Sequence, residues 1–162
     1  MHPTSCQVCY PTLILTTHLP SSTAYSTPFD SKTINQSKTK SDRPCISVLE
    51  LANATAALKY FTNTLKGQRV VIACDNEAAV SVLNTGRARC KQMANSVRSA
   101  WLTCALHDIN MTAIHTPGTL LNKPDALSRR GTDTTYDSII SNLIKMGVSV
   151  KYPDPSMFHG CI

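Results

Sequence analysis

The chain has 162 residues, which is enough for one domain with a hydrophobic core but not comfortably for two. Its formal net charge of +6 favours an acidic partner, with nucleic acid as the first candidate and a generic basic surface as the alternative. No apolar run is long enough to span a bilayer, and the first twenty residues lack a basic region followed by an apolar region, so no signal peptide is expected there. These observations predict an intracellular protein of the cytoplasm or nucleus without a membrane partner.

Seven cysteines are scattered along the chain, and this odd number argues against a disulfide framework and favours a reducing compartment. Cys6 and Cys9 form one C-x-x-C pair, but a structural zinc site would need a second pair at suitable spacing. A zinc site is therefore not predicted.

Residues 1–44 are predicted to be poorly ordered or to hold degraded first strands. Leu13–Leu15 and Thr23–Tyr25 predict two short strands. The polar and basic stretch Ser31–Arg43 predicts a loose loop or a poorly formed third strand.

Residues 45–131 carry the strongest patterns and are predicted to form the core. A stripe at helical spacing predicts a helix over Ile46–Leu65 that ends at Gly67, with Ser47 as N-cap and Glu50 completing a capping box. The apolar, mostly β-branched run Val70–Cys74 predicts a strand covered on both faces.

The rest of the chain continues this alternation of helices and strands. We expect a helix ending near Asn84, a break over 85–87, a helix over about 89–107, a strand over 109–115, a turn over 116–118 and a short helix over 122–130. Residues 132–162 are predicted to be a C-terminal extension with a helix over 137–146, a weak strand over 148–152 and a frayed tail over the last ten residues.

Three acids stand at the ends of predicted elements. Asp75 follows the buried strand, where open α/β sheets place their sites, although it could also be only the N-cap of the next helix. Glu50 lies in the first turn of the long helix, and Asp125 opens the short helix after the last strand. A few carboxylates at element ends suffice for Mg²⁺, so this set suggests two-metal phosphodiester hydrolysis. His115, at the end of the last strand, could move a proton or accompany product release, or could be structural.

A family resemblance rests on three motifs: ISVLELANATAAL, VVIACDNEAAVSVLN and HTPGTLLNKPDALSRR. In this order they resemble the ribonuclease H domain of retroelement polyproteins, closest to the reverse-transcriptase-linked domains of DIRS-like and gypsy-like elements. The resemblance covers about residues 45 to 130 and implies an α/β fold, a ribonuclease-H-like mixed sheet flanked by helices. It also implies two Mg²⁺ ions (or Mn²⁺) and the RNA strand of an RNA–DNA hybrid as substrate. By resemblance, the metal ligands are Glu50, Asp75 and Asp125, His115 is the mobile histidine, and Asn76 touches nucleic acid.

The chain departs from the family at the first strand, where the family carries an Asp ligand. Strand and turn lengths place that ligand at about 15 to 25, where Thr17 and His18 stand and no acid occurs. Asp30 is too close to Glu50 for a full three-stranded meander. The expectation is a degenerate or truncated copy that binds metal weakly.

Basic residues are expected to contact phosphates, with a solvated face as the alternative. The candidates are Arg87, Arg89, Lys91, Arg98, Arg129 and Arg130. Three functional hypotheses follow: an active hybrid nuclease, a catalytically inactive nucleic-acid-binding or purely structural module of the same fold, and an unrelated interaction domain whose acids are only caps. The last predicts that the three acids lie far apart.

Overall fold

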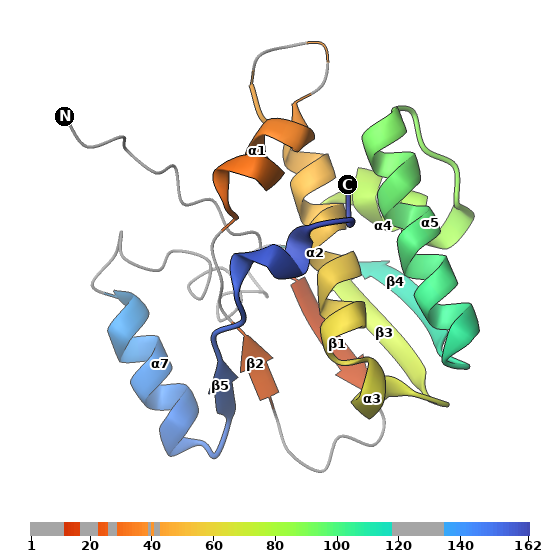
Figure 1. Cartoon of the computed structure of the whole chain (residues 1–162). Helices are drawn as coiled ribbons and strands as arrows, with labels where there is room; N and C mark the ends of the chain where they lie inside the picture. Colours follow the sequence, from red (N-terminus) through yellow and green to blue (C-terminus); the bar gives the residue numbers. More distant parts are fainter. Residues whose placement is uncertain (1–11, 17–22, 26–28, 39, 41–42, 118–134) are drawn as a thin grey trace, which may run out of the picture.

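The computed structural model describes residues 12–16, 23–25, 29–38, 40, 43–117 and 135–162, and it shows a mixed α/β structure (Figure 1). Its main sheet contains β1 (Thr12–Thr16), β3 (Arg69–Cys74) and β4 (Asn110–His115) in the order β1-β3-β4. β1 is antiparallel to β3, and β4 is parallel to it. The prediction that the strand ending at Cys74 is central is therefore confirmed.

In the described part of the chain, the helices that accompany this sheet are α2 (Ile46–Tyr60), α3 (Thr62–Leu65), α4 (Glu77–Thr85) and α5 (Lys91–Leu106). α2 and α5 lie side by side over one face of the sheet (Figure 1). Buried apolar side chains from these helices and from β3 and β4 form one core cluster, which includes Val48, Leu51, Leu58, Val70, Ile72, Val82, Leu83, Val97 and Ala113. Removing this apolar area from water is the main term that holds the layers together.

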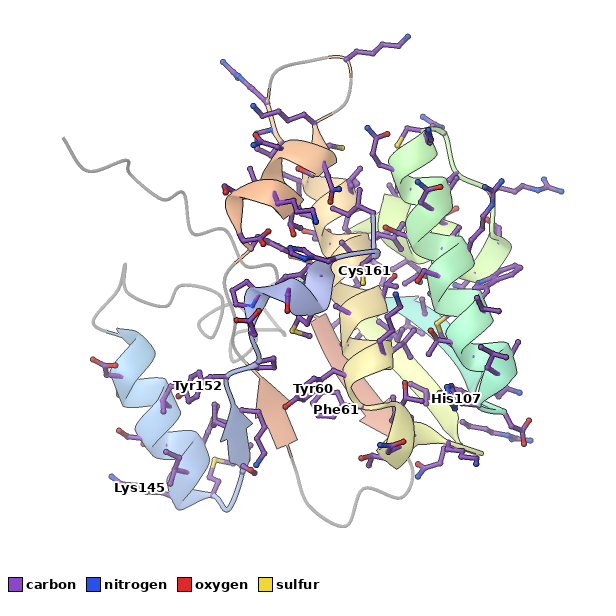
Figure 2. All side chains as sticks on the ribbon, viewed as in Figure 1. Tyr60, Phe61, His107, Lys145, Tyr152 and Cys161 are labelled. Carbon is purple, nitrogen blue, oxygen red and sulfur yellow. The ribbon has the colours of Figure 1, made fainter. Side chains whose placement is uncertain are left out.

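The long helix has the predicted apolar stripe but a different start and an interruption. α2 begins at Ile46 with Cys45 as N-cap, and Cys45 makes no side-chain capping hydrogen bond. The predicted capping box of Ser47 and Glu50 is therefore wrong, because both residues already lie inside the helix. The helix is interrupted at Phe61, whose ring packs edge-on against Tyr60 at the lower end of α2, as Figure 2 shows.

The stretch after Phe29 is helical, so the prediction of a loop or third strand over Ser31–Arg43 is wrong for its first half. α1 spans Ser31–Ser37, and the Asp30 carboxylate caps it by accepting from the Thr33 amide at 2.8 Å. An Asp directly before a helical segment is a favourable N-cap. Local capping therefore decides the structure of this segment, although its composition is polar.

A second, smaller sheet lies beside the main one (Figure 1). β2 (Thr23–Tyr25) pairs in parallel with β5 (Ser149–Lys151), and α7 (Thr135–Lys145) contacts β5. Leu143 is buried there against Ile140, Val148 and Val150. The short strand at Thr23–Tyr25 and the predicted C-terminal helix and strand are confirmed. Among the described residues, no helix combines the length and apolar character needed to cross a membrane.

The last ten residues form an ordered part of the core, so the prediction of a frayed tail is wrong. A 3-10 helix, η2 (Pro155–Phe158), packs on α2. Phe158 and Cys161 are fully buried in a second core cluster. The centroid of the Phe158 ring lies 4.3 Å from the centroid of the Phe29 ring. Figure 2 shows Cys161 beside α2. His159 also pairs with the Asp30 carboxylate at 2.7 Å, which ties the tail to α1.

Among the described residues, the outer edge of β4 pairs with a side chain and not with another strand. The amide of Asn84, on α4, accepts from the Ala113 N–H and donates to the Ala113 carbonyl, each at 2.8 Å. Pairing both backbone groups of one edge residue fixes the position of β4 relative to α4, since free edge groups must otherwise bond water.

Replacing Asn84 with alanine should therefore destabilise the protein by about 1–2 kcal/mol, through loss of two hydrogen bonds to the Ala113 backbone. Urea unfolding followed by circular dichroism measures the change. Asn63→Ala, at an exposed position on α3, is the matched control and should change stability by less than about 0.5 kcal/mol. Equal effects of the two substitutions would contradict a specific role for the Asn84 amide.

Candidate carboxylate site

The candidate site begins at the carboxyl end of β3. Val70, Ile72 and Cys74 alternate toward the helices and are buried, as the two-residue period of a strand requires. Asp75 follows at once and is only partly buried. The central strand therefore delivers an acid to one edge of the sheet beneath α2.

α2 brings a second acid to the same place. Glu50 is only 4% exposed, although it carries a carboxyl group. One ligand atom from each of Glu50, Cys74 and Asp75 lies within 4.8 Å of the others. The convergence of Glu50 with Asp75 contradicts the hypothesis that these two acids are unrelated caps lying far apart.

Asn76, rather than Asp75, caps the helix that follows β3. Its side-chain oxygen accepts from the Ala79 amide at 3.0 Å, and its amide nitrogen donates to the Ser47 hydroxyl at 3.1 Å. Asn76 thus joins the start of α4 to the start of α2 while leaving Asp75 outside the cap. The interpretation of Asp75 as only an N-cap is therefore wrong.

Burial of Glu50 makes its ionised form unfavourable. Loss of hydration is the largest cause that raises the pKa of Glu50, and the negative charge of Asp75 is the second. A hydrogen bond from the Asn76 amide lowers it. The net result is a pKa of about 8. Without a cation, Glu50 is therefore mainly protonated at neutral pH.

Cys74 lies close to both acids as a neutral thiol. Burial, with added repulsion from Glu50 and Asp75, raises the pKa of Cys74 to about 12, although backbone hydrogen bonds at Asn76 and Asp75 oppose this. Its Sγ lies 4.0 Å from Glu50 Oε2 and makes a weak hydrogen bond to it. Because only a thiolate is a good metal ligand, Cys74 acts here as a donor to Glu50.

The donor set fits a hard divalent cation. Asp75 Oδ1 is buried and has no hydrogen-bond partner in the part of the chain that the structure describes. A buried acceptor without a partner indicates a missing ligand or water. The cluster of Glu50, Cys74 and Asp75 could hold a metal ion. The two carboxylates offer oxygen ligands, which Mg²⁺ and Mn²⁺ prefer.

His115 lies at the same edge of the sheet. It is exposed at the end of β4, and it is the register partner of Cys74. The Thr116 amide donates to the Cys74 carbonyl at 2.9 Å, which holds the ends of the two strands together. The strand predicted to end at His115 is thus confirmed, and the exposed histidine lies at the same end of the sheet as Cys74.

The other predicted residues lie elsewhere or outside the described residues. Arg87, Arg89 and Lys91 are exposed where α4 connects to α5, and Arg98 is exposed on α5. The predictions that lie outside the described residues concern Asp125, Arg129, Arg130, the short helix over 122–130, Thr17 and His18.

Sequence reasoning missed two positions at this edge. Cys74 was interpreted only as a strand residue, although its place one residue before Asp75 puts it on the face that meets α2. Thr12 of β1 is the register partner of Cys74, so β1 starts at the site, while its last residue Thr16 lies opposite Val70. Only knowledge of the antiparallel pairing could have identified Thr12.

Comparisons of the chain with protein-family models, with curated proteins and with solved structures gave no match.

Proposed function

We propose that this chain is a retroelement-derived ribonuclease-H-like domain that binds nucleic acid. In this proposal Glu50 and Asp75 hold one divalent cation weakly, and the chain hydrolyses the RNA strand of RNA–DNA hybrids poorly or not at all. Ancestrally the domain would have acted beside a reverse transcriptase. The observation that carries the proposal is the meeting of Glu50 and Asp75 at the carboxyl end of the central strand.

Two features of the site support hydrolytic chemistry of this class. Glu50 and Asp75 lie in the two segments that resemble the first two retroelement motifs, in the same order. His115 is exposed at the end of the neighbouring strand. A bound cation would polarise a phosphoryl oxygen and activate water. Glu50 and Asp75 would hold it, and Asp125, which lies outside the described residues, is the third expected ligand. His115 could move a proton at the leaving oxygen.

The weakness of the site follows from β1. Its sequence, TLILT, brings no acid to the sheet edge, and the residue opposite Cys74 is Thr12. A hydroxyl or imidazole brings no negative charge to a site for Mg²⁺. Loss of one bridging carboxylate should remove most of the charge stabilisation on which phosphoryl transfer depends.

Cleavage of a labelled RNA–DNA hybrid with Mg²⁺ or Mn²⁺ tests the proposal. The unmodified chain should cleave little, and Thr12→Asp should increase the rate by about tenfold or more, since a third carboxylate would stand beside Cys74 in the strand register. Thr17→Asp and His18→Asp restore an acid at the positions expected from sequence and are the matched comparison.

Robust turnover by the unmodified chain that Asp75→Asn abolishes would contradict the claim of impairment. Retention of turnover in Asp75→Asn would exclude this site as the source of the activity. Circular dichroism of each variant verifies that it is folded.

A catalytically inactive nucleic-acid-binding module is the second candidate. The observation that favours it is the exposed basic group Arg87, Arg89, Lys91 and Arg98. Binding through phosphates should weaken steeply with salt, whereas metal removal should leave it unchanged.

A further inference from the structure

The only tryptophan of the chain is held rigidly at the surface. Trp101 lies on α5 and is 44% exposed. Its ring nitrogen donates to the Leu83 carbonyl at 2.8 Å, which joins α5 to the last turn of α4. Because one edge of the ring is anchored in this way, its orientation is fixed while a large part of its surface faces solvent.

Gly86 lies against the six-membered ring of the Trp101 indole. It adopts a left-handed conformation with φ 69° as it ends α4. A Cβ added there would lie 2.7 Å from Cη2 of Trp101, closer than real Cβ contacts. Glycine is therefore required twice, for the backbone conformation and for the close approach of the indole.

The surroundings of Trp101 are cationic. No acidic residue occurs between Glu77 and Asp108, whereas this stretch contains Arg87, Arg89, Lys91 and Arg98, all exposed. Arg98 is three residues before Trp101 on the same helix, so the two side chains occupy neighbouring positions on its surface. Arg87 directly follows Gly86, against which the ring packs.

From these observations we infer that Trp101 and the arginines around it bind a single-stranded segment of nucleic acid, with an unpaired base stacked on the indole. A fixed aromatic ring offers a face to any unpaired base, and nearby arginines neutralise the strand's phosphates. The inference rests on the proposed nucleic-acid function, and it adds a base-contacting residue and a substrate feature to it.

The proposed stacking site is separate from the carboxylate site. α4 connects them: Asp75 and Asn76 precede its first residue, and Gly86 follows its last. At about 1.5 Å per residue the nine residues of α4 span roughly 14 Å. This corresponds to about four nucleotide steps at roughly 3.4 Å each. A hybrid seated at the carboxylates would thus present a single-stranded extension to Trp101.

A protein partner is the competing occupant, because Leu102 and Leu106 are also exposed on α5. The charge distribution favours nucleic acid, since protein interfaces have few charged residues in their cores, whereas four cations without an acid suit a polyanion.

Tryptophan emission, excited selectively over the tyrosines, reports on this site alone because Trp101 is the only tryptophan. An oligothymidylate of about 12 nucleotides, titrated in the presence of EDTA, should quench the emission as bases stack on the ring. A blunt RNA–DNA hybrid of equal phosphate content should quench far less. Absence of quenching by the oligothymidylate, or equal quenching by the blunt hybrid, would overturn the inference.

Variants separate stacking from charge. By anisotropy of a labelled oligothymidylate, Trp101→Ala should weaken binding about tenfold or more with an unchanged salt slope, and Trp101→Phe should recover most of the affinity. Arg98→Gln should reduce the salt slope by about 0.7. Lys145→Gln, an exposed cation at the end of α7, is its matched control and should leave the slope unchanged.

Two further outcomes are decisive. Unchanged affinity in Trp101→Ala would overturn the inference even if the wild-type emission is quenched. Self-association that Leu102→Ala or Trp101→Ala abolishes, without quenching by oligothymidylate, would assign the surface to a protein partner instead. Since all titrations omit metal, their result is independent of hybrid cleavage, which the assay with Mg²⁺ or Mn²⁺ measures separately.

Discussion

Glu50→Gln should stabilise the metal-free protein by about 2–4 kcal/mol at pH 8, because glutamine has the shape of the protonated acid without its titration. The pKa of Glu50 is about 8 in the folded protein and close to 4.5 when unfolded. One pKa unit corresponds to about 1.36 kcal/mol, and relaxation around the buried group reduces the full value.

The direction of the pH dependence follows from linkage. Between about pH 4.5 and pH 8 the folded state binds the Glu50 proton and the unfolded state does not. The stability of the wild type should therefore fall as pH rises through this window, and below pH 4.5 the Glu50→Gln variant should gain little. Asp75 and the Cys74 thiol face Glu50 within the site, and Asn76 lies beside it.

Urea unfolding in EDTA at several pH values between 4 and 9 measures this effect. Glu77→Gln is the matched control, since it removes an exposed carboxylate from the first turn of α4 without changing a buried group. A wild-type profile that is flat from pH 4.5 to 8, or one that rises, would contradict the burial argument.

Metal linkage gives the same experiment a second readout. Addition of Mg²⁺ or Mn²⁺ should raise the wild-type unfolding temperature more at pH 8 than at pH 6, because a cation must displace the Glu50 proton. The gain should disappear in Glu50→Gln. A gain that is equal in both proteins would show that the ion binds elsewhere.

The sequence predicted the parts of this site that depend on strong local patterns. Val70–Cys74 is apolar and β-branched, and the stripe from Leu51 to Leu65 has helical spacing, so a central strand and a core helix followed from pattern alone. The meeting of Glu50 with Asp75 then followed from the strand end and the motif order. These elements are confirmed, while the nuclease function inferred from them stays a prediction.

The errors have a common physical origin in contacts that local pattern does not contain. Asp75 and Asn76 are both good N-caps, and only the register of α4 decides between them. The last ten residues were predicted to be a frayed tail because chain ends are often poorly ordered, yet Phe158 is buried in a cluster with residues of α2. Glu50 was predicted to complete a capping box with Ser47, three residues before it, because local pattern does not contain the tertiary packing that buries Glu50.

Phe158→Ala should destabilise the protein by about 3–5 kcal/mol, the usual range when a large aromatic side chain is removed from a core. Phe158 is only 1% exposed, and it packs with Phe29, Leu49 and Ala52.

The effect should extend beyond the tail, because η2 packs on α2, the helix that carries Glu50. The backbone at Cys161 is also tied to α5, where the Ser96 hydroxyl donates to the Cys161 carbonyl. Loosening this cover should expose the far side of α2 to water and weaken the buried environment of Glu50. Phe158→Ala should therefore also flatten the pH dependence of stability between about pH 4.5 and 8.

Thermal and urea unfolding at pH 5 and pH 8 measure both effects at once. Leu106→Ala is the matched control, since this side chain is 69% exposed on α5 and its removal should change stability by less than about 0.5 kcal/mol. If Phe158→Ala changes stability as little as Leu106→Ala does, the tail does not contribute to the core, and the interpretation of η2 as a structural cover is wrong. If it lowers stability but leaves the pH dependence unchanged, the tail supports the fold without shielding Glu50.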